Sequence, residues 1–467
     1  MLKINSFIKS SVFYSFGILG SKAVLFVIVP FLSFYLEQSQ LGQYDLILVS
    51  ITFLTPLITI QISDGVYRFL LEVEEEKTHK KIVSTALGVL LLCYAIFAII
   101  ASVLNLWIDY AYFYEFIILQ LTSCLYVFTQ QLFRGLKNNK WYGIMGAINT
   151  LLILSLTVLF IVVLQQGVRG LLIVLIITQI ITIILALLFS KISFGVSLYS
   201  INRVEAKRLI VYSWPLLPNA LSWWLIDLGN RYIILIFLNE QYNGVYAIAA
   251  RYAGIVAIVN SVFILTWQDY VISTDKNSTN FNLSKAFNRF IILELSLIIS
   301  LSTLSKTIVQ FTTPNSYHDA GNYLSILLMS TGLSAFCAFL GAVYLKQKNT
   351  KGIFATTIIG ALVNIVFSII FIKSLELYAV AIGSLLGFLI TLCLRLSYFK
   401  IQVNYQKLFF LLVVFCVIFT IQFVYYSTTL SFLLFIIVSV LFLVSNKSFL
   451  KKSKKLKLKQ NFKDIRK

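Results

Sequence analysis

Two charged residues, Asp227 and Arg231, stand four positions apart within the apolar stretch LSWWLIDLGNRYIILIFL, residues 221–238. Residues four apart share one face of a helix, so a carboxylate and a guanidinium at this spacing can neutralise each other. Asp64 and Arg68 repeat the spacing in ISDGVYRFLLE. A charge at the centre of a bilayer costs about 2.5–3.5 kcal/mol, and such residues commonly mark a substrate or ion pathway. Each pair therefore has two interpretations, a functional site or an ionic link between helices.

Three further charges in apolar stretches have no opposite charge one helical turn away: Lys22, Arg251 and Glu294. A water-filled cavity with surplus cations suits an anionic substrate, because lysine attracts phosphate as a point charge and arginine can hold it with two parallel hydrogen bonds. We therefore predict a cationic substrate site that contains Lys22 and Arg251, joined by the arginines of the two pairs, Arg68 and Arg231. The alternative is pairing across helices, for example of Lys22 or Arg251 with Asp227 or Glu294.

Four of the five prolines lie in or next to the apolar stretches: Pro30, Pro56, Pro215 and Pro218. Proline removes a backbone hydrogen bond and bends a helix. We consider two interpretations, bent gating helices that act as hinges and ordinary kinks without a function.

The elements that position these residues are membrane helices. The chain has 467 residues, of which 59% are hydrophobic and only 12% charged. Soluble proteins carry about 25% charged residues, so the composition indicates an integral membrane protein. The five cysteines lie in apolar runs without a CxxC pair, and the two histidines are far apart, so we expect neither a metal site nor a cofactor.

A membrane-spanning helix needs ~20 mostly apolar residues. The sequence predicts fourteen, at 10–35, 44–71, 82–106, 113–135, 141–164, 170–190, 213–238, 245–272, 286–311, 322–346, 352–372, 377–399, 406–426 and 429–446. Of the lysines and arginines between spans, only Arg169 and Lys373 fall on the side opposite the N-terminus. All the others, with Arg395 counted among them as a loop cation, fall on the side of the N-terminus. The positive-inside rule then places both termini in the cytoplasm. Asp45 is predicted at the membrane interface.

Two segments indicate an internal repeat. LGQYDLILVS at residue 41 is similar to YNGVYAIAAR at residue 242, and the basic turn before the fifth span is similar to the one before the eleventh. The predicted organisation is a six-helix lobe at 1–200, a second at 201–402, a hairpin at 403–446 and a basic cytoplasmic tail at 447–467. Parallel repeats of this kind are typical of secondary transporters, whose substrate binds between lobes that rock. No GxxxxGK[ST] motif for ATP is present.

Three stretches carry a resemblance: LGQYDLILVSITFLTPLITIQISDGVYRFLLE, FRGLKNNKWYGIMGAINT and NGVYAIAARYAGIVAIV. They resemble the bacterial O-antigen, capsule and exopolysaccharide repeat-unit flippases of the multidrug/oligosaccharidyl-lipid/polysaccharide (MOP) exporter superfamily. The resemblance implies an all-α fold and export of an undecaprenyl-pyrophosphate-linked oligosaccharide to the outer leaflet, driven by an ion gradient. Arg68 takes the family's arginine position at the end of the second span. Asp64, Asp227 and Glu294 are the candidate ion or proton carriers.

The resemblance also implies a multi-pass monomer of the bacterial cytoplasmic membrane that contacts membrane lipids, with a polysaccharide polymerase and chain-length proteins as partners. We expect no enzymatic activity. We also expect no nucleic-acid binding, because the basic residues follow membrane topology. The alternatives are a lipid II flippase, a drug/cation antiporter of the same superfamily, and a membrane polymerase or glycosyltransferase. The surplus of cations argues against the antiporter, and the short outer loops argue against the enzyme.

Overall fold

The computed structural model describes residues 28, 31–73, 75–189, 200–217, 229–273, 283–347 and 349–445. Over these ranges the chain is helical, without a β-strand. Ten of the described helices are long and apolar enough to cross a membrane, or eleven with one bent pair. This confirms the prediction of an all-α, multi-pass membrane protein. The number fourteen stays a prediction, because most of the first predicted span and half of the seventh lie outside the described residues.

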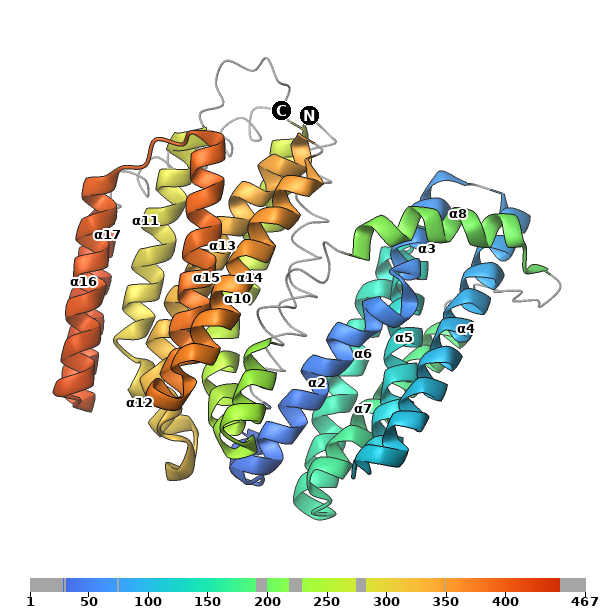
Figure 1. Cartoon of the computed structure of the whole chain (residues 1–467), viewed down its shortest axis with the longest axis horizontal. Coiled ribbons are helices and arrows are strands. Elements are labelled where there is room, and N and C mark those ends of the chain that lie inside the picture. The colour runs from blue at the N-terminus through green and yellow to red at the C-terminus, as the bar shows by residue number, and fades with distance from the viewer. Residues whose placement is uncertain are drawn as a thin grey trace, which may run out of the picture.

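The first group of helices, the N-terminal bundle, contains α2 to α7 (Figure 1). Its elements are α2 (Gln38–Thr59), α3 (Ile62–Glu72), α4 (Glu76–Ile108), α5 (Phe113–Gly135), α6 (Asn139–Thr157), its π-helical continuation η1 (Val158–Val163) and α7 (Gly167–Phe189). They are long apolar runs separated by short polar turns. Helix α8 (Arg203–Ser213), with the 3-10 turn η3 (Trp214–Leu216), lies across the ends of α3 and α4.

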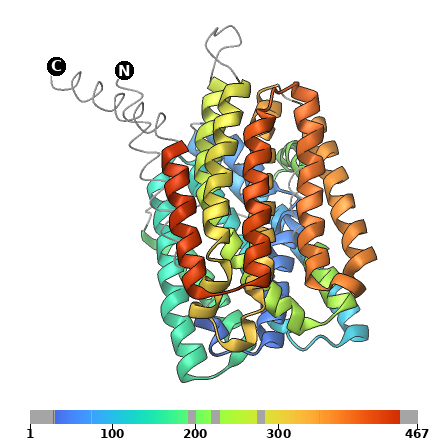
Figure 2. The same cartoon turned by 90° about the vertical axis from the view of Figure 1, so that its left-hand side faces the viewer.

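The second group, the C-terminal bundle, begins with the helical residues 229–237. It continues with α10 (Glu240–Ser273), α11 (Leu283–Ser302), α12 (Ser305–Thr312), the turn η4 (Asn315–Tyr317), α13 (Ala320–Lys346), α14 (Thr350–Leu375), α15 (Leu377–Phe399), α16 (Tyr405–Val424) and α17 (Thr428–Ser445). Helix α13 is the most enclosed of the candidate spans. The hairpin α16–α17 packs against α11 on the outside of the bundle (Figure 2).

Asparagine side chains begin several of these helices. Asn138, Asn202, Asn349 and Asn404 each accept a hydrogen bond from a backbone N–H in the first turn of α6, α8, α14 and α16. Asparagine is among the best residues for this role, because its side-chain oxygen satisfies an amide that the helix itself cannot. The caps explain why these polar turns end one helix and start the next.

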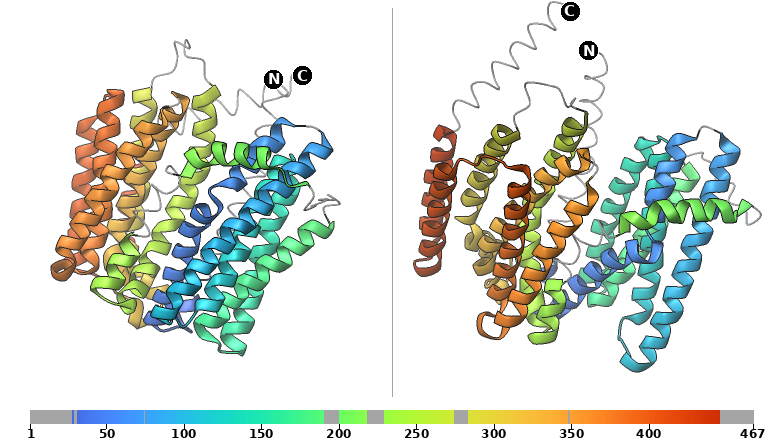
Figure 3. Two further views of the ribbon diagram at one scale, coloured as in Figure 1. Left: turned by 45° about the vertical axis from the view of Figure 1, so that its right-hand side comes forward. Right: turned by 45° about the horizontal axis from the view of Figure 1, so that its top comes forward.

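The two bundles meet at one end and diverge toward the end that carries α8 (Figures 1 and 3). The contact includes the first turns of α2 and α10. A Cβ atom on Gly42 would overlap the carbonyl oxygen of Glu240, and one on Gly244 would overlap that of Gln38. Glycine is therefore required at both positions for the helices to approach this closely. These glycines occupy matching positions in the two similar segments of the predicted repeat.

Two predicted spans are broken in the structure. The span predicted at 44–71 is interrupted at Ile60 and Gln61, whose φ angles of 49° and 56° are left-handed, one turn after Pro56. The span predicted at 286–311 forms α11 and α12, which meet at an angle of 51°. Pro215 lies in the 3-10 turn after α8, while Pro30 and Pro218 lie outside the described residues. The hinge role of the prolines stays a prediction.

Candidate functional site

A cavity of about 720 Å³ lies between the two bundles. Helices α2, α5 and α7 line it from the N-terminal bundle. Helix 229–237 and helices α10, α13 and α15 line it from the C-terminal bundle. A cavity that both bundles share is accessible from different sides if they move relative to each other.

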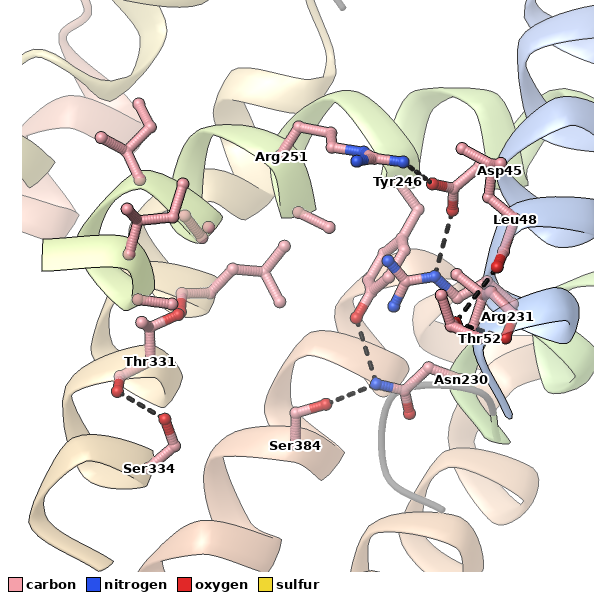
Figure 4. A pocket seen from close by; sticks show the side chains of 18 of the residues that line it. Asp45, Leu48, Thr52, Asn230, Arg231, Tyr246, Arg251, Thr331, Ser334 and Ser384 are labelled. Atoms are coloured by element: carbon pink, nitrogen blue, oxygen red, sulfur yellow. Dashed lines mark hydrogen bonds and ion pairs between the residues drawn. The ribbon is translucent and has the colours of Figure 1, made fainter. Parts of the chain in front are cut away.

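One carboxylate in this cavity binds two arginines across the bundle interface. Asp45 of α2 accepts a hydrogen bond from Arg231 Nε at 3.1 Å and from Arg251 Nη2 at 3.2 Å (Figure 4). The Asp45 and Arg231 side chains are almost fully enclosed, at 3% and 6% exposure, whereas Arg251 is 37% exposed. Arg251 is thus the member of the cluster that a ligand in the cavity reaches first.

The cluster answers part of what the sequence left open. Arg251 has a partner across the helices, and that partner is Asp45 rather than Glu294. Asp45, expected at the membrane interface, is buried between the bundles. Helical spacing suggested Asp227 for Arg231, but Asp227 lies outside the described residues, as does Lys22.

Asn230, next to Arg231 in the chain, is the centre of a network of polar side chains. The amide of Asn230 donates to Ser384 Oγ at 2.7 Å and to Tyr246 OH at 3.1 Å, and its oxygen accepts from Asn364 at 2.9 Å. The Arg231 guanidinium lies over the Tyr246 ring, 5.1 Å from its centre. A cation held over an aromatic ring is stabilised by the ring's electrons. Through Tyr246 the network is connected to the guanidinium that binds Asp45 (Figure 4).

Beyond the cluster the cavity is lined mainly by apolar side chains, and the uncharged polar side chains among them were not predicted. Those of the N-terminal bundle are Thr52, Ser123 and Gln179, and those of the C-terminal bundle include Ser330, Thr331 and Ser334. Ser330, Thr331 and Ser334 fall on one stripe of α13, a spacing that is visible in the sequence. Hydroxyl and amide groups of this kind can exchange hydrogen bonds with the hydroxyl groups of a sugar.

The predicted pair of Asp64 and Arg68 does not form. Arg68 Nη2 binds Glu72 at 2.7 Å, one turn further along α3, where both side chains are about half exposed. Asp64 Oδ1 instead accepts from Gln131 Nε2 of α5 at 2.7 Å. The two residues therefore serve different contacts, because α3 turns Asp64 toward α5 and leaves Arg68 close to solvent. Neither is among the residues that line the cavity.

Among the residues that the structure describes, Glu294 and Arg395 are buried charges that lie apart from the cavity. Glu294 accepts a hydrogen bond from Asn260 Nδ2 at 2.7 Å in the interior of the C-terminal bundle. Arg395, counted as a loop cation, is fully buried in α15. It donates to the carbonyl of Cys337 and to the hydroxyls of Thr356 and Thr357, and so ties α13, α14 and α15 together. Its assignment to a loop was wrong, because the last turn of α15 is covered by its neighbours.

Comparison with protein families decides the affiliation. The family described as "Polysaccharide biosynthesis protein" matches residues 7–268, more than half of the chain. The chain belongs to this family. The resemblance stated from the sequence is thereby confirmed at the level of the family. A search of curated protein sequences gives no match.

Solved structures show that this polysaccharide biosynthesis protein has the fold of the MOP superfamily. The structure titled "Lipid II flippase MurJ, inward closed conformation" is 15% identical, with a TM-score of 0.75 over 94% of this chain and 100% of that chain. An inward-facing multidrug resistance MATE family transporter of the MOP superfamily is 13% identical, with a TM-score of 0.66 over 84% of this chain and 95% of that chain. Both titles name transport proteins, in agreement with the expectation of a transporter rather than an enzyme.

Proposed function

We propose that the protein is a flippase for lipid-linked oligosaccharides. It moves undecaprenyl-pyrophosphate-linked repeat units of a surface polysaccharide from the cytoplasmic to the outer leaflet of the bacterial cytoplasmic membrane. The observation that carries the proposal is the cavity between the bundles, which holds two arginines and one carboxylate in the chain of a polysaccharide biosynthesis family member.

The charges of the cavity favour an anionic substrate. Among the described residues that line the cavity, the charged side chains are those of Asp45, Arg231 and Arg251. Together these three carry one positive charge. Arginine binds phosphate with two parallel hydrogen bonds. The pyrophosphate of a lipid carrier, or an acidic sugar, fits this surplus, whereas a cationic drug does not. Lys22 is a further proposed cation of the same site.

The neutral part of the cavity favours the glycan. Ser330, Thr331 and Ser334 on one wall face a cavity that Ser123 and Gln179 line from the other bundle. Such groups hydrogen-bond to sugar hydroxyls without demanding one arrangement. In the proposed mechanism the glycan occupies the cavity and the prenyl tail stays in the bilayer. The bundles then rock about their contact, with an ion gradient as the driving force.

Deletion of the gene from its own host tests the proposal. We expect loss of the surface polysaccharide and accumulation of its lipid-linked units inside the cell, with peptidoglycan synthesis unchanged. A lipid II flippase is the second candidate, because the MurJ fold aligns with 94% of the chain. That candidate is favoured if the chain instead restores growth of a conditional lipid II flippase mutant and deletion leaves the surface polysaccharide intact.

A further inference from the structure

We propose that the exposed face of α8 lies in the headgroup layer of the cytoplasmic leaflet and binds anionic phospholipids through Arg203 and Lys207. The inference concerns a surface outside the cavity and does not depend on which substrate is transported. It follows from three observations on α8: its position on the N-terminal bundle, the apolar side chains that it exposes, and the charges next to them.

Helix α8 is fixed across α3 and α4 (Figure 3). Ser213 is buried against α3, where a Cβ atom on Gly65 would overlap its hydroxyl. At the other end of α8 the backbone N–H of Asn202, the N-cap residue, donates to Thr85 Oγ1 of α4 at 3.1 Å. Both ends of the helix are therefore held by the N-terminal bundle, and this determines which of its faces points outward.

The contact with α4 lies on the side of that helix that faces lipid. Thr85 and Gly88, which α8 contacts, continue as one helical stripe into Leu92, Ile96 and Ile99. Those three apolar side chains are 63%, 51% and 65% exposed, as on a helix surface that contacts acyl chains. In the other direction α4 begins with the charged turns EKTHKK. Helix α8 therefore crosses α4 where the charged turns end and the lipid-facing surface begins, which is the level of the headgroups.

The outward face of α8 is apolar. Val204 and Val211, two turns apart on one stripe, are 76% and 63% exposed, and Trp214 in the turn η3 is 59% exposed. A helix that exposes such side chains beside a charged edge is typical of one that lies in the membrane interface. Tryptophan is enriched there, because its ring is apolar and its N–H is polar. The face therefore matches the boundary between headgroups and acyl chains.

Two cations next to this face select the charge of the lipid. Arg203 and Lys207 are one turn apart and exposed, and neither has a carboxylate partner among the residues that the structure describes. Other exposed arginines of the N-terminal bundle and α8 do have one: Arg68 binds Glu72 at 2.7 Å, Arg169 binds Glu115 at 2.6 Å, and Arg208 binds Glu205 at 3.4 Å. A guanidinium and an ammonium group without a partner at the level of the lipid phosphates attract anionic headgroups more strongly than zwitterionic ones.

A fluorescent label on α8 tests the inference. Val211→Cys is labelled with bimane in a chain whose five native cysteines are replaced by serine or alanine. The labelled full chain is placed in phosphatidylcholine nanodiscs that contain a small, fixed fraction of a nitroxide lipid, which is either phosphatidylglycerol or phosphatidylcholine. Iodide in the buffer is the water-soluble quencher. Glu76→Cys, at the start of α4, is the aqueous reference, because the Glu76 side chain is 80% exposed.

We expect nitroxide phosphatidylglycerol to quench the Val211 label at least twofold more than nitroxide phosphatidylcholine does. The double variant Arg203→Gln, Lys207→Gln should make the two lipids equal, and Arg203→Lys should keep the preference. Iodide should quench the Val211 label at least threefold less than the label at Glu76.

The matched control is the double variant Lys351→Gln, Lys400→Gln. It removes two exposed cations from the end of the C-terminal bundle that is predicted to face the cytoplasm, and it should leave the preference for phosphatidylglycerol unchanged. A loss of preference in this control equal to that in the α8 variant would overturn the inference, because the lipid would then respond to the overall charge of that end.

Equal quenching by the two nitroxide lipids in the parent chain would also overturn the inference, as would a preference that survives the loss of both Arg203 and Lys207. Iodide access at Val211 equal to that at Glu76 would do the same, since the face would then lie in water and be open to a protein partner. None of these results bears on the proposed function, which is tested separately by gene deletion.

Discussion

Arg231 and Arg251 share a carboxylate but differ in exposure, and this separates their roles. Arg231 is enclosed and lies over Tyr246, so it holds Asp45. Arg251 is open to the cavity. We expect Arg251→Ala to reach the membrane at parental levels and to lower surface polysaccharide at least tenfold. Arg251→Lys should keep partial activity, since the charge remains but the planar fork is lost, and Arg251→Glu should be worse than alanine.

Arg231→Ala is the comparison for stability. The substitution leaves the buried carboxylate of Asp45 without one of its two arginine partners. Disruption of a buried ion pair costs about 3–5 kcal/mol. We therefore expect a lower thermal unfolding temperature for Arg231→Ala than for Arg251→Ala in detergent. Surface polysaccharide at the parental level in Arg251→Ala would contradict the proposed role of that arginine.

Glu294 is one of the proposed ion-coupling carboxylates. It lies in the described part of the C-terminal bundle, whereas Asp227 does not. Its oxygen accepts from Asn260, and a glutamine oxygen accepts equally well. Glu294→Gln should therefore fold at normal levels and lose export, because an amide cannot exchange a proton or bind a cation by charge. The measurement is surface polysaccharide normalised to membrane protein. Normal export in Glu294→Gln would assign Glu294 a structural role only.

The site shows what sequence spacing can and cannot reveal at this scale. Arg231 and Arg251 were predicted as cavity cations because a charge in an apolar stretch is visible in one sequence. Their shared partner Asp45 lies 186 and 206 positions away. Helical periodicity compares residues only within one helix and so could not find Asp45. At Arg68 two carboxylates lie four positions away in the same helix, and the structure pairs Arg68 with Glu72 rather than Asp64. The partner of a buried charge depends on tertiary packing.

At the scale of elements, the crossing of α2 and α10 depends on its glycines. A methyl group on Gly42 or Gly244 would meet a backbone carbonyl, which cannot move aside as a flexible side chain can. Overpacking at a close contact costs about 1–3 kcal/mol. Gln38 of α2 donates to the carbonyl of Ser316 across the bundles, so cysteines introduced at both positions can be joined by a short thiol-specific cross-linker. We expect Gly42→Ala and Gly244→Ala to push the helices apart and to lower the cross-linked fraction of this Gln38→Cys and Ser316→Cys pair. Gly143→Ala in α6, which meets nothing within 4 Å, is the control. An unchanged fraction in both interface variants would contradict this role.

Most helices could be predicted, and their breaks could not. Apolar runs and asparagine turns mark α6, α14 and α16 in the sequence. The bend between α11 and α12 lies in the stretch SLSTLSKT, whose serine and threonine residues also occur within unbroken helices of this chain, so they do not by themselves mark a break. A backbone carbonyl at the bend, that of Thr303, accepts a hydrogen bond from a distant residue, Gln422 of α16, at 3.0 Å. Breaks of this kind depend on donors that only the folded bundle supplies.

At the scale of the whole molecule, the two bundles form a carrier that is closed at one end. The contact near Gly42 and the Asp45 cluster lie at the end predicted to face outward, and the bundles diverge toward the end predicted to face the cytoplasm (Figures 1 and 3). Fold class and family were predictable because hydropathy and topology determine them. The substrate was predictable only by chemical class, since it depends on side chains that both bundles bring together.

Translocation in proteoliposomes tests the central claim most directly. Lipid-linked units extracted from the flippase-deficient host are placed in the inner leaflet, and a membrane-impermeant glycosidase outside reports their arrival. The account predicts release of glycan by liposomes with the parent chain and with Glu115→Gln, and release at the rate of protein-free liposomes with Arg251→Ala. Release by the parent chain no faster than by protein-free liposomes, under an imposed ion gradient of either direction, would contradict it.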